Sequence, residues 1–129
     1  MKLFLVLFLC FNLGYNFIRR IPFVTLDKRI VKGLKEPEPK KGHVLLHDLF
    51  VYYDQMDEVS KLIEARNTKG VKLIKTVGKN GPRFLNVSYN LEHLYRTYKW
   101  KGDDIDELET SLAGNKYLWN YLKTFKLHI

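Results

Sequence analysis

The stretch from Gly81 to Lys126 constrains the fold of this chain most, because its side-chain composition and charge change several times within it. It opens with Gly-Pro-Arg-Phe-Leu, continues as a basic and aromatic segment, and then becomes acidic at Asp-Asp-Ile-Asp-Glu-Leu. Polar and aromatic residues alternate over Tyr95–Lys101, which indicates a strand with two unlike faces. The carboxylates that follow are stabilising at a helix start. The succession predicts strand, strand, helix, strand, and nothing in it resembles catalytic machinery.

The residues before Gly81 predict an earlier strand and helix. Val44–Tyr53 is apolar and rich in β-branched and aromatic residues over about one strand length. Asp54 suits a helix N-cap, and apolar residues at helical spacing follow it as far as Arg66. The next strand, Val71–Val77, continues as extended chain after the turn-forming residues Gly-Lys-Asn-Gly-Pro.

The predicted order is therefore strand, helix, strand, strand, helix, strand. This order is typical of the ferredoxin-like βαββαβ plan, an α+β fold with a four-stranded antiparallel sheet and two helices on one face. Helical and strand patterns compete in the last segment, 117–127, where Ala113-Gly114-Asn115 is the expected turn before it. Its aromatic residues fall on odd positions and favour a strand; they are Tyr117, Trp119, Tyr121 and Phe125. A helical C-terminal segment would contradict this fold.

The charge of the chain restricts its partners. Its 129 residues include 22 Lys and Arg against 14 Asp and Glu, a formal net charge of +8. A small domain with such an excess attracts polyanions, nucleic acid first and an anionic membrane second. A basic but inert surface is the alternative.

The N-terminal segment has a character of its own. Lys2 precedes the apolar run Leu3–Leu13, and no acidic residue occurs before Asp27. The run is too short to span a bilayer comfortably and fits a secretory signal; an uncleaved anchor extended through Ile18 is the alternative. Cys10 is the only cysteine, so a processed chain would contain no disulfide and no cysteine nucleophile.

A basic spacer follows this segment. Lys35–Gly42 (KEPEPKKG) carries two prolines and no apolar residue, and proline biases its predecessor toward extended backbone. We therefore expect a signal or targeting segment at 1–18, a spacer at 19–43 and the domain at 44–129. The two-part leader resembles those that reach a complex plastid through the secretory route; an ordinary secretory signal with a linker is the alternative.

No catalytic, metal or cofactor site is predicted. The four histidines show no metal-binding spacing, and the segment 78–81 is too short for a glycine-rich phosphate loop. The serines lack the context of an activated nucleophile. The histidines are His43, His47, His93 and His128.

Several local motifs resemble the bacterial-type ribosomal protein number six of the small subunit. Gly81–Leu85 matches a GxRxL segment on that family's second strand. Tyr98–Gly102 matches an aromatic–x–aromatic strand end before an acidic helix, and Asn115 precedes a matching pattern at Leu118–Lys123. The resemblance covers residues 44–127 and implies the ferredoxin-like fold.

The resemblance also implies a function. It predicts a non-enzymatic constituent of an organellar small ribosomal subunit, which binds small-subunit rRNA beside ribosomal protein eighteen and other small-subunit proteins. Phosphate-binding cations are expected on one hairpin formed by the second and third strands. They are Lys72, Lys75, Lys79, Arg83, Arg96, Lys99 and Lys101, with partner contacts at Phe84, Tyr89, Tyr98 and Trp100.

Two questions stay open from the sequence. The alternative function is a secreted or lumenal interaction or effector domain without enzymatic activity. The expected location is a plastid ribosome reached through the secretory route, with a mitochondrion or secretion as alternatives.

Overall fold

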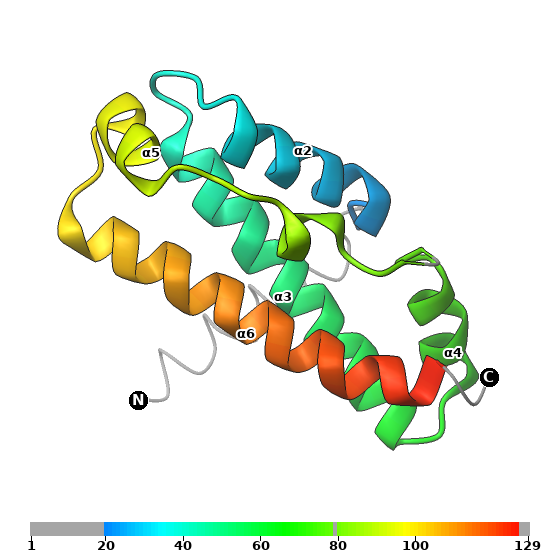
Figure 1. The fold of residues 1–129 in the computed structure, drawn as a ribbon. Coiled ribbons are helices and arrows are strands. Elements are labelled where there is room, and N and C mark those ends of the chain that lie inside the picture. Colours follow the sequence, from blue (N-terminus) through cyan, green and yellow to red (C-terminus); the bar gives the residue numbers. More distant parts are fainter. Residues whose placement is uncertain (1–19, 79, 127–129) are drawn as a thin grey trace, which may run out of the picture.

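Three helices form the body of the molecule in the computed structural model, which describes residues 20–78 and 80–126. They are α2 (Phe23–Lys35), α3 (Gly42–Glu64) and α6 (Gly102–Lys126). α3 and α6 pack side by side and run in the same direction, whereas α2 packs on α3 and runs in the opposite direction (Figure 1). The shorter elements are α4 (Thr68–Lys75), the 3₁₀ turn η1 (Arg83–Asn86) and α5 (Leu91–Tyr98).

The predicted ferredoxin-like fold is wrong, because the described residues contain helices and no strand. The expected first strand, Val44–Tyr53, lies inside α3. Its apolar residues belong to one buried helical stripe that runs on past Asp54 into the helix that was predicted there. Spacings of three and four residues mark this stripe. Its buried members are Leu45, Leu46, Leu49, Tyr52, Met56 and Val59.

The expected last strand is also wrong, because α6 continues without a break through the predicted turn Ala113-Gly114-Asn115. The buried residues of α6 again follow helical spacing, whereas the two tyrosines that favoured a strand are exposed, Tyr117 by 77% and Tyr121 by 38%. Two of the four aromatic residues behind the strand prediction therefore stay outside the core, whereas Trp119 packs against it. The buried residues are Leu108, Asn115, Leu118 and Leu122.

Close approach of α3 and α6 is fixed near Asn115. Its side-chain Nδ2 donates to the carbonyl of Leu49 on α3 at 3.4 Å and to that of Ser111 at 2.8 Å. Beside it, a Cβ on Gly114 would lie 3.4 Å from the ring of Tyr53. A buried amide and an adjacent glycine thus lie at the contact between the two long helices.

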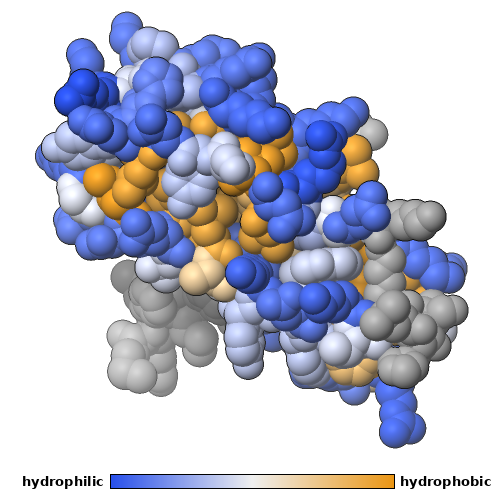
Figure 2. Space-filling view, viewed as in Figure 1, coloured by the Kyte–Doolittle hydropathy of each residue, from blue (hydrophilic) through white to orange (hydrophobic). Residues whose placement is uncertain are grey.

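The chain returns along the molecule as an extended strap over residues 77–78 and 80–90 (Figure 1), and Figure 2 shows apolar surface in the region that the strap crosses. The Phe84 backbone N–H donates to Oδ1 of Asp27 on α2 at 3.0 Å, in a buried hydrogen bond. The Phe84 ring packs edge-on against Tyr52, with ring centroids 4.9 Å apart. This strap contains the Gly81–Leu85 segment that was expected on a strand, so the sequence motif serves docking between helices.

Gly81 is required by this strap. Its φ is +73°, a left-handed conformation that glycine adopts without strain. A Cβ at this position would also lie 2.5 Å from the Trp119 ring of α6, so a side chain does not fit. Pro82 beside it is buried.

α5 ties the far end of the strap to α2 and α3. The Tyr98 hydroxyl donates to the carbonyl of Gly33 on α2 at 2.6 Å, and Tyr98 stacks beside Trp100 with ring centroids 4.9 Å apart. α2 therefore lies within the packed core, although it falls in the segment 19–43 expected as a spacer. The expected leader, 1–18, lies outside the described residues, and none of the described helices has the length and apolarity needed to cross a membrane.

Candidate polyanion-binding surface

The longest stretch of the chain that carries only positive charge lies between Glu64 and Glu92. No Asp or Glu occurs from residue 65 to residue 91, although the chain as a whole has 14 of them. This stretch contains α4, the strap and η1. Its basic residues are Arg66, Lys69, Lys72, Lys75, Lys79 and Arg83.

α4 begins with a standard cap and packs tightly on the end of α3. The Asn67 side-chain oxygen accepts from the Lys69 backbone N–H at 2.9 Å, as an N-cap residue does. Gly70 is buried, and a Cβ there would lie 2.9 Å from the backbone nitrogen of Ile63. Ile74 is fully buried as well. Because this side of the short helix faces the core, its lysines are directed to solvent.

We define the α4 basic surface as Arg66, Lys69, Lys72 and Lys75. All four residues are exposed. None of them takes part in the ion pairs found over residues 20–78 and 80–126, whereas Lys61 of α3 pairs with Asp57 at 3.0 Å. Charges without a carboxylate neighbour are the ones that can bind phosphate without first breaking an ion pair.

Arg66 holds a strained backbone conformation within this surface. Its φ is +56°, in the left-handed region that costs a non-glycine residue roughly 1–2 kcal/mol. Its N–H donates to the Ile63 carbonyl at 2.9 Å and that of Asn67 donates to the Leu62 carbonyl at 2.8 Å. This is the Schellman ending of a helix, in which glycine is usual at the position of Arg66. An arginine at that position retains charge at the expense of stability.

The acidic residues lie mostly elsewhere. Five of them occupy the first eight residues of α6, and none follows Glu109 in that helix. Its later part carries Lys116 and Lys123, both exposed. α4 packs against α6 near the C-terminal turns of that helix (Figure 1). Positive charge is therefore concentrated at this end of the bundle.

The expected RNA-binding residues do not form one hairpin. Lys72 and Lys75 belong to the α4 basic surface, and Arg83 is exposed on η1. Lys79 lies outside the described residues. Arg96, Lys99 and Lys101 lie on α5 and after it, at the opposite end of the bundle from α4 (Figure 1). The expected hairpin of cations is therefore wrong, because α4, the strap and α5 take the place of its two strands and separate these residues.

Three of the four expected partner contacts lie in the core of this chain. Phe84, Tyr98 and Trp100 are exposed by only 1%, 8% and 4%. Tyr89 on the strap is 37% exposed and is the one that can still meet a partner. The aromatic residues that the sequence assigned to a surface thus hold the strap and α5 in place.

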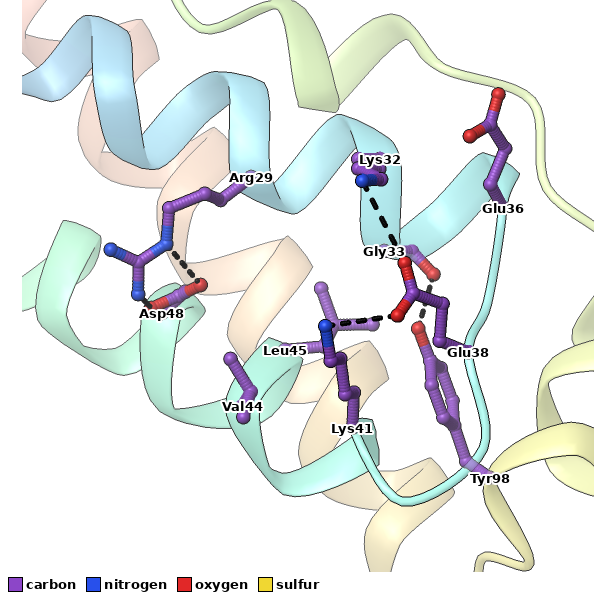
Figure 3. A pocket seen from close by; sticks show the side chains of 10 residues that line it. All are labelled: Arg29, Lys32, Gly33, Glu36, Glu38, Lys41, Val44, Leu45, Asp48 and Tyr98. Carbon is purple, nitrogen blue, oxygen red and sulfur yellow. Dashed lines mark hydrogen bonds and ion pairs between the residues drawn. The ribbon is translucent and has the colours of Figure 1, made fainter.

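A shallow pocket of about 220 Å³ lies between α2, α3 and Tyr98 (Figure 3). Five of its six charged side chains are paired: Arg29 pairs with Asp48, and Glu38 pairs with Lys41 at 2.9 Å and with Lys32 at 3.6 Å. The sixth, Glu36, is exposed. The hydrogen bond from Lys41 and the charge of both lysines hold the pKa of Glu38 below its ordinary value. The pocket is smaller than most ligand sites, and most of its charges are already paired.

The described residues contain no cluster of three or more His, Cys, Asp or Glu side chains that could hold a metal ion. His43, His47 and His93 are exposed and lie on α3 and α5; His128 lies outside the described residues. The basic surface on α4 is therefore the feature with the clearest chemistry.

Sequence reasoning missed two members of that surface, Arg66 and Lys69. The signal that would have found them is the absence of acidic residues from 65 to 91, which does not depend on the secondary structure. The chain matches no protein-family model, no curated protein and no solved structure. The proposal for function therefore depends on the fold and this surface.

Proposed function

We propose that this protein is a non-catalytic binding module that holds the phosphate backbone of an RNA on its α4 basic surface. The observation that carries the proposal is the set of four exposed cations without a carboxylate partner, in a stretch without acidic residues. Lysine ammonium groups neutralise phosphates and release counterions, which supplies affinity without reading sequence.

The geometry of α4 suits a run of phosphates. Lys69, Lys72 and Lys75 follow one another at three-residue spacing, so they span about 9 Å along the helix. They lie side by side on its outer surface, and Arg66 precedes them at the end of α3. A few consecutive phosphates of one strand suffice to contact all four.

An anionic membrane fits α4 less well than a nucleic acid. Helices that lie in a membrane surface insert an apolar side into the lipid. The apolar residues of α4 are already packed on the domain, with Ile74 fully buried and Val71 and Leu73 half-buried. The helix presents its charges to the solvent, while its apolar side chains are held against the domain.

Residence in an organellar small ribosomal subunit beside ribosomal protein eighteen stays a prediction. Its structural basis, the match of short motifs to strands, no longer supports it, because those residues form the strap, α5 and α6. The plastid, mitochondrial and secreted locations, and the alternative of a lumenal interaction domain, stay predictions as well. Sedimentation of the cellular protein with small ribosomal subunits tests the ribosomal assignment.

The test of RNA binding compares two triple variants of the full chain with equal net charge. The first carries Lys69→Gln, Lys72→Gln and Lys75→Gln on α4; the control carries Arg96→Gln, Lys99→Gln and Lys101→Gln at the other end. Affinity for a labelled single-stranded RNA is measured by fluorescence anisotropy. Each lost phosphate contact lowers affinity about fivefold near 0.1 M salt, so the α4 variant should lose about 100-fold. Equal losses in both variants would show that only net charge matters and would contradict the proposed surface.

A further inference from the structure

The strap carries the only Asn-X-Ser/Thr tripeptide of the chain, Asn86-Val87-Ser88. This pattern, with any residue except proline in the middle, is the acceptor for N-linked glycosylation. A glycosylated asparagine belongs on a surface loop, because the sugar chain is bulky and polar. The pattern is short and common in sequences, so the place of Asn86 in the fold decides whether it can carry a glycan.

The tripeptide presents its two reactive side chains to the solvent. Asn86 is the last residue of η1 and is exposed, Val87 is half-buried against the core, and Ser88 is exposed again. Val87 has φ −86° and ψ 130°, an extended conformation in which successive side chains point to opposite sides. The Asn86 amide and the Ser88 hydroxyl therefore lie on the side of the strap that faces away from the core.

Neither of these two side chains holds the fold together. In the part of the chain that the structure describes, the Asn86 amide and the Ser88 hydroxyl make no hydrogen bond. By contrast, the side-chain oxygens of Asn67 and Asn90 accept backbone N–H groups at 2.9 and 3.0 Å and cap α4 and α5. A substituent on Asn86 therefore breaks no contact, unlike one on either helix cap.

A glycan on Asn86 has room and a surface to cover. η1 lies across α2 and α6, about midway along the bundle (Figure 1). The two neighbours of Asn86, Leu85 and Val87, are only half-buried, and apolar surface is visible in the region that the strap crosses (Figure 2). A polar sugar chain beside such a surface solubilises it. α4 lies at one end of the bundle, so its basic surface stays accessible (Figure 1).

The rest of the sequence suits the compartment in which N-glycans are added. The apolar run Leu3–Leu13 behind Lys2 has the pattern of a secretory signal and predicts entry into that compartment. The compartment is oxidising, so free thiols there are liable to form disulfides. Residues 20–126 contain no cysteine, so the folded domain has no thiol to protect.

We propose that Asn86 is an N-glycosylation site. The donor is an oligosaccharide joined to a lipid through a pyrophosphate, and the acceptor is Nδ2 of Asn86. A bond forms between Nδ2 and the anomeric carbon of the first sugar, while the bond from that carbon to the pyrophosphate oxygen breaks. The lipid pyrophosphate leaves with the electron pair of that bond, and the amide nitrogen gives one proton to a base of the transferase. The Ser88 hydroxyl hydrogen-bonds the transferase and holds the acceptor in place.

The modification does not depend on RNA binding, because Asn86 lies outside the α4 basic surface. It does bear on location. A chain that carries this glycan has passed through the secretory lumen, which is compatible with the secreted and plastid predictions and excludes direct import into a mitochondrion.

The test uses the full-length chain, translated with microsomes from the endoplasmic reticulum. The parent chain should give one band of slower gel mobility, which peptide N-glycosidase removes. The glycosidase converts a glycosylated asparagine to aspartate, so treatment in heavy-oxygen water should leave labelled aspartate at position 86, identified by mass spectrometry. Asn86→Gln and Ser88→Ala should each lose the slower band. Both should keep the circular dichroism and unfolding midpoint of the unglycosylated parent, because neither side chain is buried or hydrogen-bonded.

A further variant separates failure of entry from failure of the acceptor. Lys69→Thr gives Asn67 the same tripeptide pattern, so this chain should carry two glycans where the parent carries one. A glycan on Asn67 alone would show that the chain enters the lumen and that Asn86 is not accepted, which would overturn the proposal. The absence of a glycan from both chains would show that the protein does not enter the lumen and would overturn it as well.

Discussion

Arg29 of α2 binds Asp48 of α3 through both oxygens of the carboxylate, with Nε 3.1 Å from Oδ2 and Nη2 2.5 Å from Oδ1 (Figure 3). The Asp48 side chain is only 2% exposed, whereas that of Arg29 is 45% exposed. The buried carboxylate therefore depends on an arginine that reaches it from the surface. This pair fixes α2 on α3, within the segment that the sequence assigned to a spacer.

Arg29→Leu should lower the free energy of unfolding by about 3 kcal/mol, because it leaves Asp48 buried without a counter-charge. The double change Arg29→Leu and Asp48→Leu should restore most of that loss, since two apolar side chains replace the pair. Urea denaturation followed by circular dichroism measures both. A single variant as stable as the parent chain would mean that the pair does not hold α2 on the core.

Removal of the Tyr52 hydroxyl should make the protein more stable. Its side chain is fully buried, and its hydroxyl has no hydrogen-bond partner over residues 20–78 and 80–126. An unpaired buried polar group costs roughly 1–3 kcal/mol. Tyr52→Phe should therefore raise the free energy of unfolding by about 1 kcal/mol in urea denaturation. A loss of stability would instead reveal a hydrogen bond to the hydroxyl.

The buried Tyr52 hydroxyl should also lower the stability of the protein at alkaline pH. Burial, aided by the charge of Asp27, raises the pKa of the Tyr52 hydroxyl above its ordinary value of 10.0. Above pH 10 the unfolded chain loses this proton while the folded chain keeps it, so stability falls as pH rises, by up to about 1.4 kcal/mol per pH unit from this group. Tyr52→Phe should make the decline between pH 10 and pH 11 shallower by about 1 kcal/mol, because the full slope is reached only above the pKa of the unfolded chain. Parallel declines in the two proteins would exclude Tyr52 as the cause.

Two glycines test the docking of the strap. Gly81→Ala should lower the free energy of unfolding by at least about 2 kcal/mol, because the new methyl group meets the Trp119 ring and a positive φ is strained for alanine. Gly102→Ala is the matched control, since nothing lies within 4 Å of a Cβ there. Thermal unfolding of the two variants measures the difference. Equal melting temperatures would contradict the packing of the strap on α6.

Arg66→Gly should separate stability from binding. Glycine relieves the left-handed strain at the end of α3 and should raise the free energy of unfolding by about 1 kcal/mol. It also removes one cation from the α4 basic surface and should weaken RNA binding about fivefold near 0.1 M salt. Lys99→Gly relieves the same strain at the end of α5, where φ is +54°. The Lys99 variant should gain stability and keep its affinity; a matching loss of affinity would place RNA at both ends of the molecule.

The sequence predicted some elements correctly because their signals were local. The helix that follows Asp54 and the acidic helix after Gly102 both exist, since apolar residues at helical spacing and early carboxylates act within a few turns. The lengths of both helices were wrong. At the start of α3 and in the second half of α6, a strand pattern competed with the helical pattern. In Val44–Tyr53 it consisted of apolar β-branched residues, and after Asn115 of aromatic residues at odd positions.

Tertiary packing decided those boundaries. Leu49 and Tyr52 are buried together with Met56, so a single helix through all three buries more apolar surface than a strand followed by a helix. Gly114 lies inside α6, where Tyr53 of α3 packs beside it. The candidate site was predicted in part, through Lys72 and Lys75, because charge is visible in sequence. Which cations lie together could not be predicted, since that depends on the fold.

The salt dependence of RNA affinity tests the central claim most directly. If the α4 basic surface holds about four phosphates, a plot of log affinity against log salt for a single-stranded RNA should have a slope of about −3, measured between about 50 and 200 mM salt. Replacing Lys69, Lys72 and Lys75 by glutamine should reduce that slope to about −1, while the Arg96, Lys99 and Lys101 variant should keep the parent value. An unchanged slope in the α4 variant would contradict the account.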